Sequence, residues 1–225
     1  MQRLTLFRNN KPVITIDGTA GSGKGTLAKK IASSLGYDHL DTGLLYRYLA
    51  YLKISEGLRL DDIDTLKGLK INYPSIKKVM LKTELISKEA SVISKEKIIR
   101  DFLLSFQRDF ANNPPSFKGS VIDGRDIGSV VIPNAEIKFF IDASIDIRVK
   151  RRLKELNLTE ESSSRDYKNI FSQIEDRDIR DKTRKRSPLL VPEGAYSIDT
   201  SNLTVNDTLI KALTIINSIL SNKTN

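Results

Sequence analysis

The stretch VITIDGTAGSGKGTLAKKIASSL, residues 13–35, decides the fold of this chain. An apolar run at 13–16 predicts a buried strand, and Leu27, Ile31 and Leu35 recur at the spacing of a helix over 24–35. Four glycines lie between the two elements, at positions 18, 21, 23 and 25. Glycine allows positive φ and close backbone approach, so successive N–H groups can turn inward on an anion. Because the helix start adds free N–H groups and a positive dipole end, the stretch predicts a phosphate-binding loop.

The end of this loop departs from the strict phosphate-loop pattern. Lys24 supplies the expected charge for the β- and γ-phosphates of a nucleotide, but Gly25 follows it where the pattern has Ser or Thr. The hydroxyl comes one residue later, on Thr26, and this GxxGxGKGT variant is the one seen in nucleoside monophosphate kinases. A glycine-rich turn without a ligand is the alternative, which the strand–loop–helix context disfavours. The predicted ATP-binding residues are Gly18, Thr19, Ala20, Gly21, Ser22, Gly23, Lys24, Gly25 and Thr26.

Composition limits the classes of protein that remain. The 225 residues suit one α/β domain with insertions, and 39% hydrophobic with 29% charged residues is typical of a globular protein. No run approaches the eighteen apolar residues of a membrane span, and residues 1–11 lack a signal core, so we expect a cytoplasmic protein without a membrane partner. The absence of cysteine excludes disulfides and thiolate metal sites. The single histidine, His39, lies in a predicted strand, where we expect a structural role.

The net charge of +9 is distributed unevenly. Eight of the fifteen arginines fall within residues 148–186, whereas lysines are spread along the whole chain. Scattered lysine indicates a solvated surface, and clustered arginine suits bidentate phosphate binding in a site. We therefore expect small phosphate-bearing ligands and no nucleic-acid partner.

Strand patterns alternate with helical ones, which predicts a parallel sheet covered on both faces. The predicted strands are 13–17, 37–41, 119–123, 136–141 and 195–199. The predicted helices are 24–35, 43–55, 97–110, 144–156, 166–184 and 205–221. Two segments fit this core poorly: residues 61–95 have mixed periodicity and indicate an inserted subdomain, and the polar stretch 157–165 indicates a mobile lid.

Two motifs follow predicted strands, where open α/β sheets bind their ligands. In residues 41–47, DTGLLYR, Thr42 and Arg47 lie close enough on a helix to reach one acceptor phosphate, although Asp41 or Thr42 could instead cap that helix. In residues 121–128, VIDGRDIG, Arg125 offers a phosphate fork and Asp126 a carboxylate acceptor. An Arg–Asp surface turn is the alternative for this second motif.

Charged side chains also recur on two predicted helices. Spacings of four and seven put Arg177, Asp181 and Arg184 on one helix face, which by itself is also typical of an exposed, ion-paired helix. A second cluster follows i, i+3, i+4 spacing on the preceding helix: Arg148, Arg151 and Arg152. These arginines could stabilise charge on a transferring phosphoryl group.

The motifs in their order, with Ser187-Pro188-Leu189 after them, closely resemble bacterial cytidylate kinase over nearly the whole chain. The resemblance implies an α/β fold: a single P-loop kinase domain over 1–225 with a five-stranded parallel sheet of order 2-3-1-4-5. It also implies an NMP-binding insertion, here 61–112, and a short lid region at about 150–185. The insertion is shorter than usual in this family, with less room for an antiparallel sheet.

The resemblance further implies residue roles. Cytosine would be recognised by Ser91, Arg100 and Asp126, whose serine, arginine and carboxylate match the ring carbonyl, the ring nitrogen and the exocyclic amine. The remaining substrate contacts would come from Arg177 and Asp181 at the ribose and from Thr42, Arg47, Arg125 and Arg184 at the acceptor phosphate. The expected catalytic residues are Lys24, Arg125, Arg148, Arg152 and Arg184.

The expected reaction is phosphoryl transfer from MgATP to CMP and dCMP, carried out by a monomer. Mg²⁺ would rely on phosphates and water with Thr26, and with Asp17 or Asp123 further out. A kinase for UMP, AMP or another small acceptor is the nearest alternative; the carboxylate of Asp126 favours an amino-bearing ring such as cytosine over uracil. A basic nucleic-acid-binding module regulated by ATP is the alternative from another class, and dispersed aromatics at 7% disfavour it.

Overall fold

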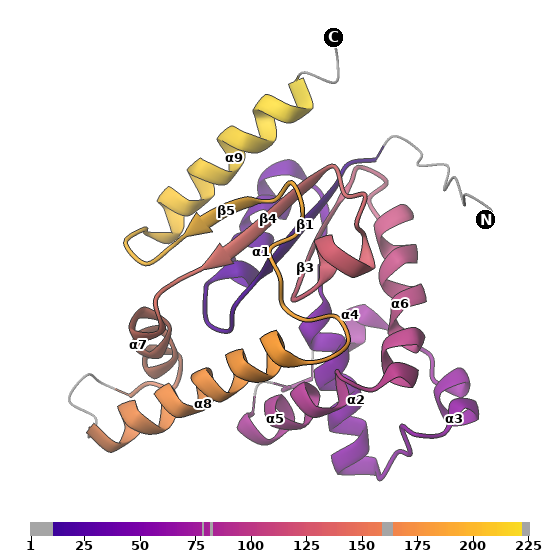
Figure 1. Ribbon diagram of the computed structural model, residues 1–225. Helices are drawn as coiled ribbons and strands as arrows, with labels where there is room; N and C mark the ends of the chain where they lie inside the picture. Colours follow the sequence, from indigo (N-terminus) through magenta and orange to yellow (C-terminus); the bar gives the residue numbers. More distant parts are fainter. Residues whose placement is uncertain (1–10, 78, 82, 159–163, 222–225) are drawn as a thin grey trace.

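The first predicted strand, β1 (Val13–Gly18), lies at the centre of a five-stranded sheet and is buried along its whole length. The structure is a computed structural model that describes residues 11–77, 79–81, 83–158 and 164–221. Figure 1 shows the sheet surrounded by helices, with α9 along one side and α2 to α6 on the other. A strand buried on both faces reads as a continuous apolar run, as residues 13–16 do.

The strand order confirms the prediction. All neighbours are parallel and the order is β2-β3-β1-β4-β5. The other strands are β2 (Asp38–Asp41), β3 (Ser120–Gly124), β4 (Ile137–Asp142) and β5 (Tyr196–Asp199). Parallel strands bring their carboxyl ends to one edge of the sheet, so the ends of β1, β2 and β3 lie side by side there.

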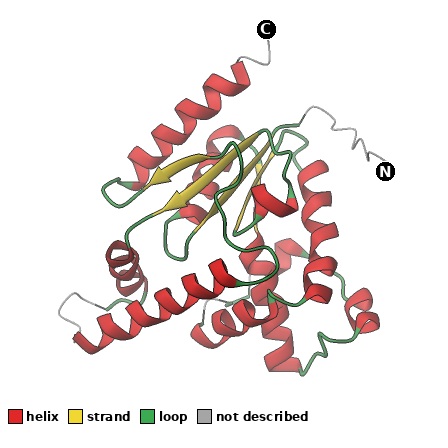
Figure 2. Cartoon of the chain, in the orientation of Figure 1, coloured by secondary structure: helices red, strands yellow, loops and turns green. Residues whose placement is uncertain are grey.

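Two hydrophobic clusters hold helices against the sheet. Ile14 and Ile16 of β1 pack with α1 (Lys24–Leu35) and α9 (Val205–Ser221). Val13 belongs to the other cluster, with α2 (Thr42–Glu56) and α6 (Lys97–Asn112). Because successive side chains of a strand point to opposite faces, these clusters form the two sides of a three-layer structure, seen by element type in Figure 2.

The segment after α2 is helical where the structure describes it. It contains α3 (Ile63–Gly68), α4 (Tyr73–Ile76) and α5 (Glu84–Ile93), which the mixed periodicity did not predict. Each begins at a side chain that accepts a backbone hydrogen bond: Asp62, Asn72 and Thr83. Their apolar residues join the same cluster as α2, so 61–112 shares the core; its treatment as an insertion stays a prediction.

After β3 comes a single π-helical turn, η1 (Ile127–Val131). The predicted lid region, about 150–185, covers the second half of α7 (Ile145–Glu155) and α8 (Ser164–Thr183), which pack together through a small apolar cluster. Of the predicted lid loop 157–165, residues 159–163 lie outside the described residues. The side-chain amide of Gln173 on α8 donates to Glu84 of α5 at 2.9 Å, which links these two helices. In the ranges described, no helix is long and apolar enough to cross a membrane.

Candidate active site

The loop between β1 and α1 adopts the backbone that its glycines allow. Gly23 caps α1 in the left-handed region, with φ 88°. A Cβ on Gly18 would lie 2.0 Å from the carbonyl oxygen of Ile141, so no other residue fits where β1 passes β4. The helix predicted over 24–35 begins and ends at those residues, and Lys24 is its first residue. The loop therefore directs the N-terminus of α1 at the carboxyl edge of the sheet.

Side chains bind the carbonyl groups of the loop. Arg125 Nη1 donates to Gly18 O at 2.7 Å, and Lys24 Nζ donates to Thr19 O at 3.2 Å. Arg148 Nη1 donates to Ala20 O at 3.2 Å. In a planar trans peptide the carbonyl and the N–H of the next residue point in opposite directions. Each carbonyl bound by a side chain therefore turns the following N–H group away from that side chain.

The last loop carbonyl, Ser22 O, has two donors from distant parts of the chain. Arg151 Nη1 donates to it at 3.1 Å and Thr200 Oγ1 at 3.0 Å. Asp142 at the end of β4 accepts from Thr19 Oγ1 at 2.6 Å. Sequence reasoning missed Thr200 and Asp142, and no local pattern marks either of them. The loop is held in one conformation by residues from β4, α7 and the turn after β5.

Positive charge is concentrated beside the loop. Burial, followed by the charge of Arg125, lowers the pKa of Lys24 to about 7. Burial, then Arg125 among the neighbouring charges, lowers the pKa of Arg177 to about 9. Burial also lowers the pKa of Arg47, with contributions from Arg125 and Arg152. Cations that disfavour one another's charge in this way are typical of a site that binds a polyanion.

The carboxylates near the loop are engaged by the protein. Asp17 accepts backbone N–H groups of Ile127 and Gly128, both at 2.7 Å, and burial raises its pKa to about 7. Asp123 Oδ1 lies 2.6 Å from His39 Nε2, which gives that histidine a structural contact. Within the described ranges no group of three or more acidic or histidine side chains could hold a metal ion. Of the predicted metal-binding positions, Thr26 is exposed at the start of α1.

The motif at 41–47 begins α2 and serves as its cap. Asp41 Oδ1 accepts from the N–H of Leu44 at 3.2 Å, so the capping alternative is confirmed for Asp41. Thr42 Oγ1 donates to Asp123 O at 2.8 Å, which ties α2 to the end of β3. Arg47 lies one turn further on, and one of its terminal nitrogens would lie 3.2 Å from a Cβ on Gly43. Thr42 and Arg47 are thus brought to the edge of the site together.

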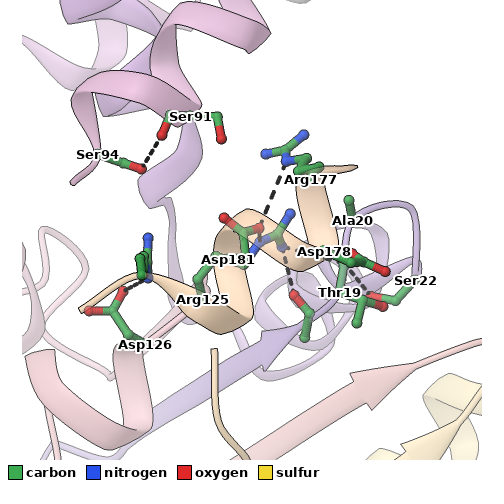
Figure 3. Close-up of polar contacts among 12 residues, drawn as sticks. Thr19, Ala20, Ser22, Ser91, Ser94, Arg125, Asp126, Arg177, Asp178 and Asp181 are labelled. Atoms are coloured by element: carbon green, nitrogen blue, oxygen red, sulfur yellow. Dashed lines mark hydrogen bonds and ion pairs between the residues drawn. The ribbon is translucent and has the colours of Figure 1, made fainter. Parts of the chain in front are cut away.

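On the nucleoside side, Asp126 joins two elements through ion pairs. Arg100 of α6 forms an ion pair with its Oδ2, and Arg184 Nη2 lies 3.5 Å from its Oδ1. Arg100 Nη1 also donates to Ser94 O at the end of α5, at 3.2 Å. Ser91 lies one turn before Ser94 on α5 and is buried. These side chains come from α5, α6, the turn after β3 and the end of α8, and Figure 3 shows Ser91, Ser94 and Asp126 on this side.

Between the two sides, Arg125 bridges the loop and α8. Its Nε donates to Asp181 Oδ2 at 2.8 Å, and Arg177 Nε lies 3.9 Å from the same oxygen (Figure 3). The helix ends at Thr183, and Arg184 is the next residue; its N–H still donates to Arg180 O at 3.2 Å, so it continues the last helical turn. Arg184 reaches the site, since the last turn directs it at Asp126.

Three predicted substrate residues have buried polar atoms with no hydrogen-bond partner among the described residues. They are Ser91 Oγ, Arg177 Nε and Arg184 Nη2. A buried donor or acceptor without a partner is costly, and a ligand that supplies one removes that cost. Their roles at the nucleoside and its phosphate stay predictions.

Two expected catalytic arginines differ in their surroundings. Arg148 is buried behind the loop, with Nε on Ala143 O at 2.9 Å and an ion pair to Asp178 Oδ2 at 2.6 Å. Arg152 is 31% exposed and contacts Glu155 at 3.0 Å. Arg152 remains accessible to a ligand, whereas Arg148 contacts backbone and carboxylate. Their catalytic roles stay predictions.

Comparison with known proteins agrees with this geometry. The family model for cytidylate kinase matches residues 14–218. The chain is 43% identical over 215 residues to a cytidylate kinase of Bartonella bacilliformis, covering 94% of this chain and 97% of that one. It is 39% identical to a cytidylate kinase of Paramagnetospirillum magneticum over 208 residues, covering 92% and 98%.

Solved structures support the fold. An uncharacterized protein from Eubacterium ventriosum superposes with a TM-score of 0.55 at 16% identity, covering 92% of this chain and 99% of that one. A shikimate kinase from Bacteroides thetaiotaomicron superposes with a TM-score of 0.50 at 13% identity, covering 92% and 98%. At such identities these likenesses concern the fold alone. The sequence matches over nearly the whole chain show that it belongs to the cytidylate kinase family.

Proposed function

We propose that the protein transfers the γ-phosphoryl group of ATP to CMP and dCMP, giving ADP and CDP or dCDP. Membership of the family supports the reaction. The observation that carries the proposal is the set of unmatched buried atoms on Ser91, Arg177 and Arg184, beside a cluster of cations. A ligand that combines hydrogen-bonding groups with phosphate matches both features.

The transfer is one in-line displacement. An oxygen of the CMP phosphate forms a bond to the γ-phosphorus of ATP while the bond from that phosphorus to the β,γ-bridging oxygen breaks, and ADP leaves. Such chemistry needs positioning and charge stabilisation rather than a nucleophilic side chain. The loop and Lys24 hold ATP, and Arg47, Arg125 and Arg184 place the acceptor phosphate. Arg125 suits this role because its guanidinium already lies between the loop and α8.

The base is read by groups from three elements. Ser91, Arg100 and Asp126 face the cytosine carbonyl, ring nitrogen and amine in this proposal. A carboxylate accepts from the amine of cytosine, and uracil has a carbonyl at that position. The ion pairs of Asp126 with Arg100 and Arg184 hold and orient this carboxylate for the role.

Mg²⁺ fits the chain as a metal held mainly by nucleotide phosphates. Thr26, two residues after Lys24, is exposed and offers a hydroxyl, whereas Asp17 is occupied by two backbone N–H groups. Mg²⁺ usually keeps several waters and takes few protein ligands, which suits a site without an acidic cluster among the described residues. When bound, it neutralises charge on the transferring phosphates. The cytoplasmic location and the monomeric state stay predictions.

The experiment that tests the proposal is ADP release from MgATP with CMP, dCMP, UMP, AMP, GMP and dTMP in parallel. Turnover largely confined to CMP and dCMP is the expected result. Preference for another monophosphate would leave the protein assigned as a kinase but would overturn the roles of Ser91, Arg100 and Asp126. Absence of turnover with every acceptor, together with salt-dependent binding of RNA or DNA, would favour the nucleic-acid-binding alternative.

A further inference from the structure

Two carboxylates of α8 reach the phosphate-binding loop through arginine side chains. Asp181 contacts Arg125, which donates to Gly18 O, and Asp178 contacts Arg148, which donates to Ala20 O. The carboxylates are three residues apart and therefore lie on neighbouring positions of one helix face. Figure 3 shows Asp178 and Asp181 of α8 beside the loop residues Thr19, Ala20 and Ser22. The family resemblance assigns Arg125 and Asp181 to the substrate, but it gives Asp178 no role.

The Arg148–Asp178 pair is closed off from solvent. The exposed fractions are 6% for Arg148 and 8% for Asp178, and the pair distance is 2.6 Å. Arg148 Nε donates to Ala143 O, and its Nη1 lies within reach of both Ala20 O and Asp178. A Cβ on Gly21 would lie 3.2 Å from Cβ of Arg148, so α7 packs directly on the loop. One guanidinium thus joins the loop, the end of β4 and α8.

The contact with Ala20 O has a consequence on the opposite side of the peptide. The Ala20–Gly21 peptide is trans and planar, so its N–H points away from its carbonyl. A cation on Ala20 O therefore directs the N–H of Gly21 away from α7. Gly21 adopts φ 75°, and because glycine has no Cβ its backbone can leave this conformation if that carbonyl is released.

We propose that Arg148 and Asp178 are positioning residues for ATP: Asp178 holds the Arg148 guanidinium on Ala20 O, and this orients the Gly21 N–H toward the nucleotide phosphates. The inference rests on the proposed function for the identity of the nucleotide. Stability alone does not explain the pair, because a buried ion pair is frequently no more stabilising than apolar side chains of similar volume. The hydrogen bond from Arg148 to Ala20 O gives the pair a role in ligand binding.

The test compares three variants with the full-length wild type. Asp178→Asn keeps the side-chain volume and removes the charge that holds Arg148. The double variant Arg148→Met/Asp178→Leu replaces the pair by apolar side chains of similar size, and so it removes the cation without leaving a buried charge. Asp176→Asn makes the same change at an exposed position of α8 and is the matched control. The readouts are the Kd of ATP by calorimetry, the KM of ATP and of CMP, kcat, and Tm.

We expect kcat/KM for ATP to fall by about 10- to 100-fold in the double variant, and by a smaller factor in Asp178→Asn, since misplaced binding groups cost rates of this order. The KM of CMP stays within about twofold of wild type, and the Tm of the double variant is not lowered. Asp176→Asn behaves as wild type. A purely structural pair would instead lower Tm or move both KM values together.

Wild-type ATP affinity and KM in the folded double variant would overturn the proposal, as would equal losses toward ATP and CMP. If the double variant does not fold, the Asp178→Asn variant provides the test: the proposal requires its KM for ATP to change more than its KM for CMP. Failure of the proposed function is distinct from these outcomes, because it is absence of CMP phosphorylation by the wild type. The Kd of ATP, measured without an acceptor, would still decide whether the pair positions the loop.

Discussion

The two halves of the site differ in what their polar groups contact. On the ATP side, the carbonyls of Gly18, Ala20 and Ser22 accept from arginine side chains of the surrounding elements. On the nucleoside side, buried atoms of Ser91, Arg177 and Arg184 have no hydrogen-bond partner among the described residues. The first half is held by contacts within the chain. In the proposed function the second half gains hydrogen-bond partners from the substrate, which makes it the place where substrates are distinguished.

Removal of the Lys24 cation from the ATP side should have the largest effect on activity. Lys24→Ala should lower kcat by about 10²- to 10³-fold, because a charge that stabilises the transferring phosphoryl group is lost from a fixed site. Steady-state turnover with CMP measures the effect. Tm should stay within a few degrees of wild type, because the loop keeps its other contacts. Turnover close to wild type would refute the role of Lys24.

Asp126→Asn tests the half that depends on the ligand. Its kcat/KM for CMP should fall by about 10- to 100-fold, the range of a lost hydrogen bond to a charged group. Activity with UMP should change far less, so comparison of both substrates in the same variant provides the control. An unchanged preference for CMP over UMP would show that another group reads the base.

Arg152 belongs neither to the side chains that bind loop carbonyls nor to the residues with unsatisfied buried atoms, so it provides a third test of the site. Arg152→Ala should lower kcat by about tenfold, less than a fully enclosed arginine finger, since its side chain is 31% exposed. Glu155→Ala removes its ion-pair partner and is the matched control, for which we expect wild-type turnover. Equal effects of both substitutions would indicate that the helix surface, and not the cation, matters.

The smallest effect concerns pH. In the protein without ATP, burial lowers the pKa of Lys24 to about 7. Bound phosphates favour the charged form of this side chain, so above pH 7 the protein takes up a proton when ATP binds. ATP affinity should therefore be complete below pH 7 and fall by about fivefold between pH 7 and pH 8, from this group alone. Calorimetry in buffers of different ionisation enthalpy measures the uptake. In Lys24→Arg, whose guanidinium does not titrate, the uptake should disappear.

The sequence allowed the sheet and the loop to be predicted closely, because both depend on local patterns. The apolar run at 13–16, the glycines and the helix over 24–35 follow from spacing alone, and strand order followed from the family resemblance. Helices α3 and α4 were missed because they have only six and four residues, and α5 was missed although its buried Ile86, Ala90 and Ile93 follow helical spacing. All three begin at a capping side chain, such as Asp62 and Thr83. A search for capping residues before apolar positions would have indicated them.

The supports of the loop were harder to predict than the loop. Arg148 was recognised in a cluster of arginines and assigned to the phosphoryl group, yet the structure places it on Ala20 O and Asp178. Spacing along a helix identifies a shared face, but it does not say which element covers that face. Thr200 offers no pattern, since its role arises only when β5 is next to β4.

The hydrogen bond between Thr200 and Ser22 spans 178 residues of sequence, and it has a consequence for the order of folding. The loop leaves the ribosome early in synthesis, before β3, β4 and the turn after β5 exist to hold it. Contacts of such long sequence separation form slowly, because a large loop of chain must close first. Chains that end before Thr200 therefore lack a complete nucleotide loop, and the first motif to be synthesised is among the last to reach its native state.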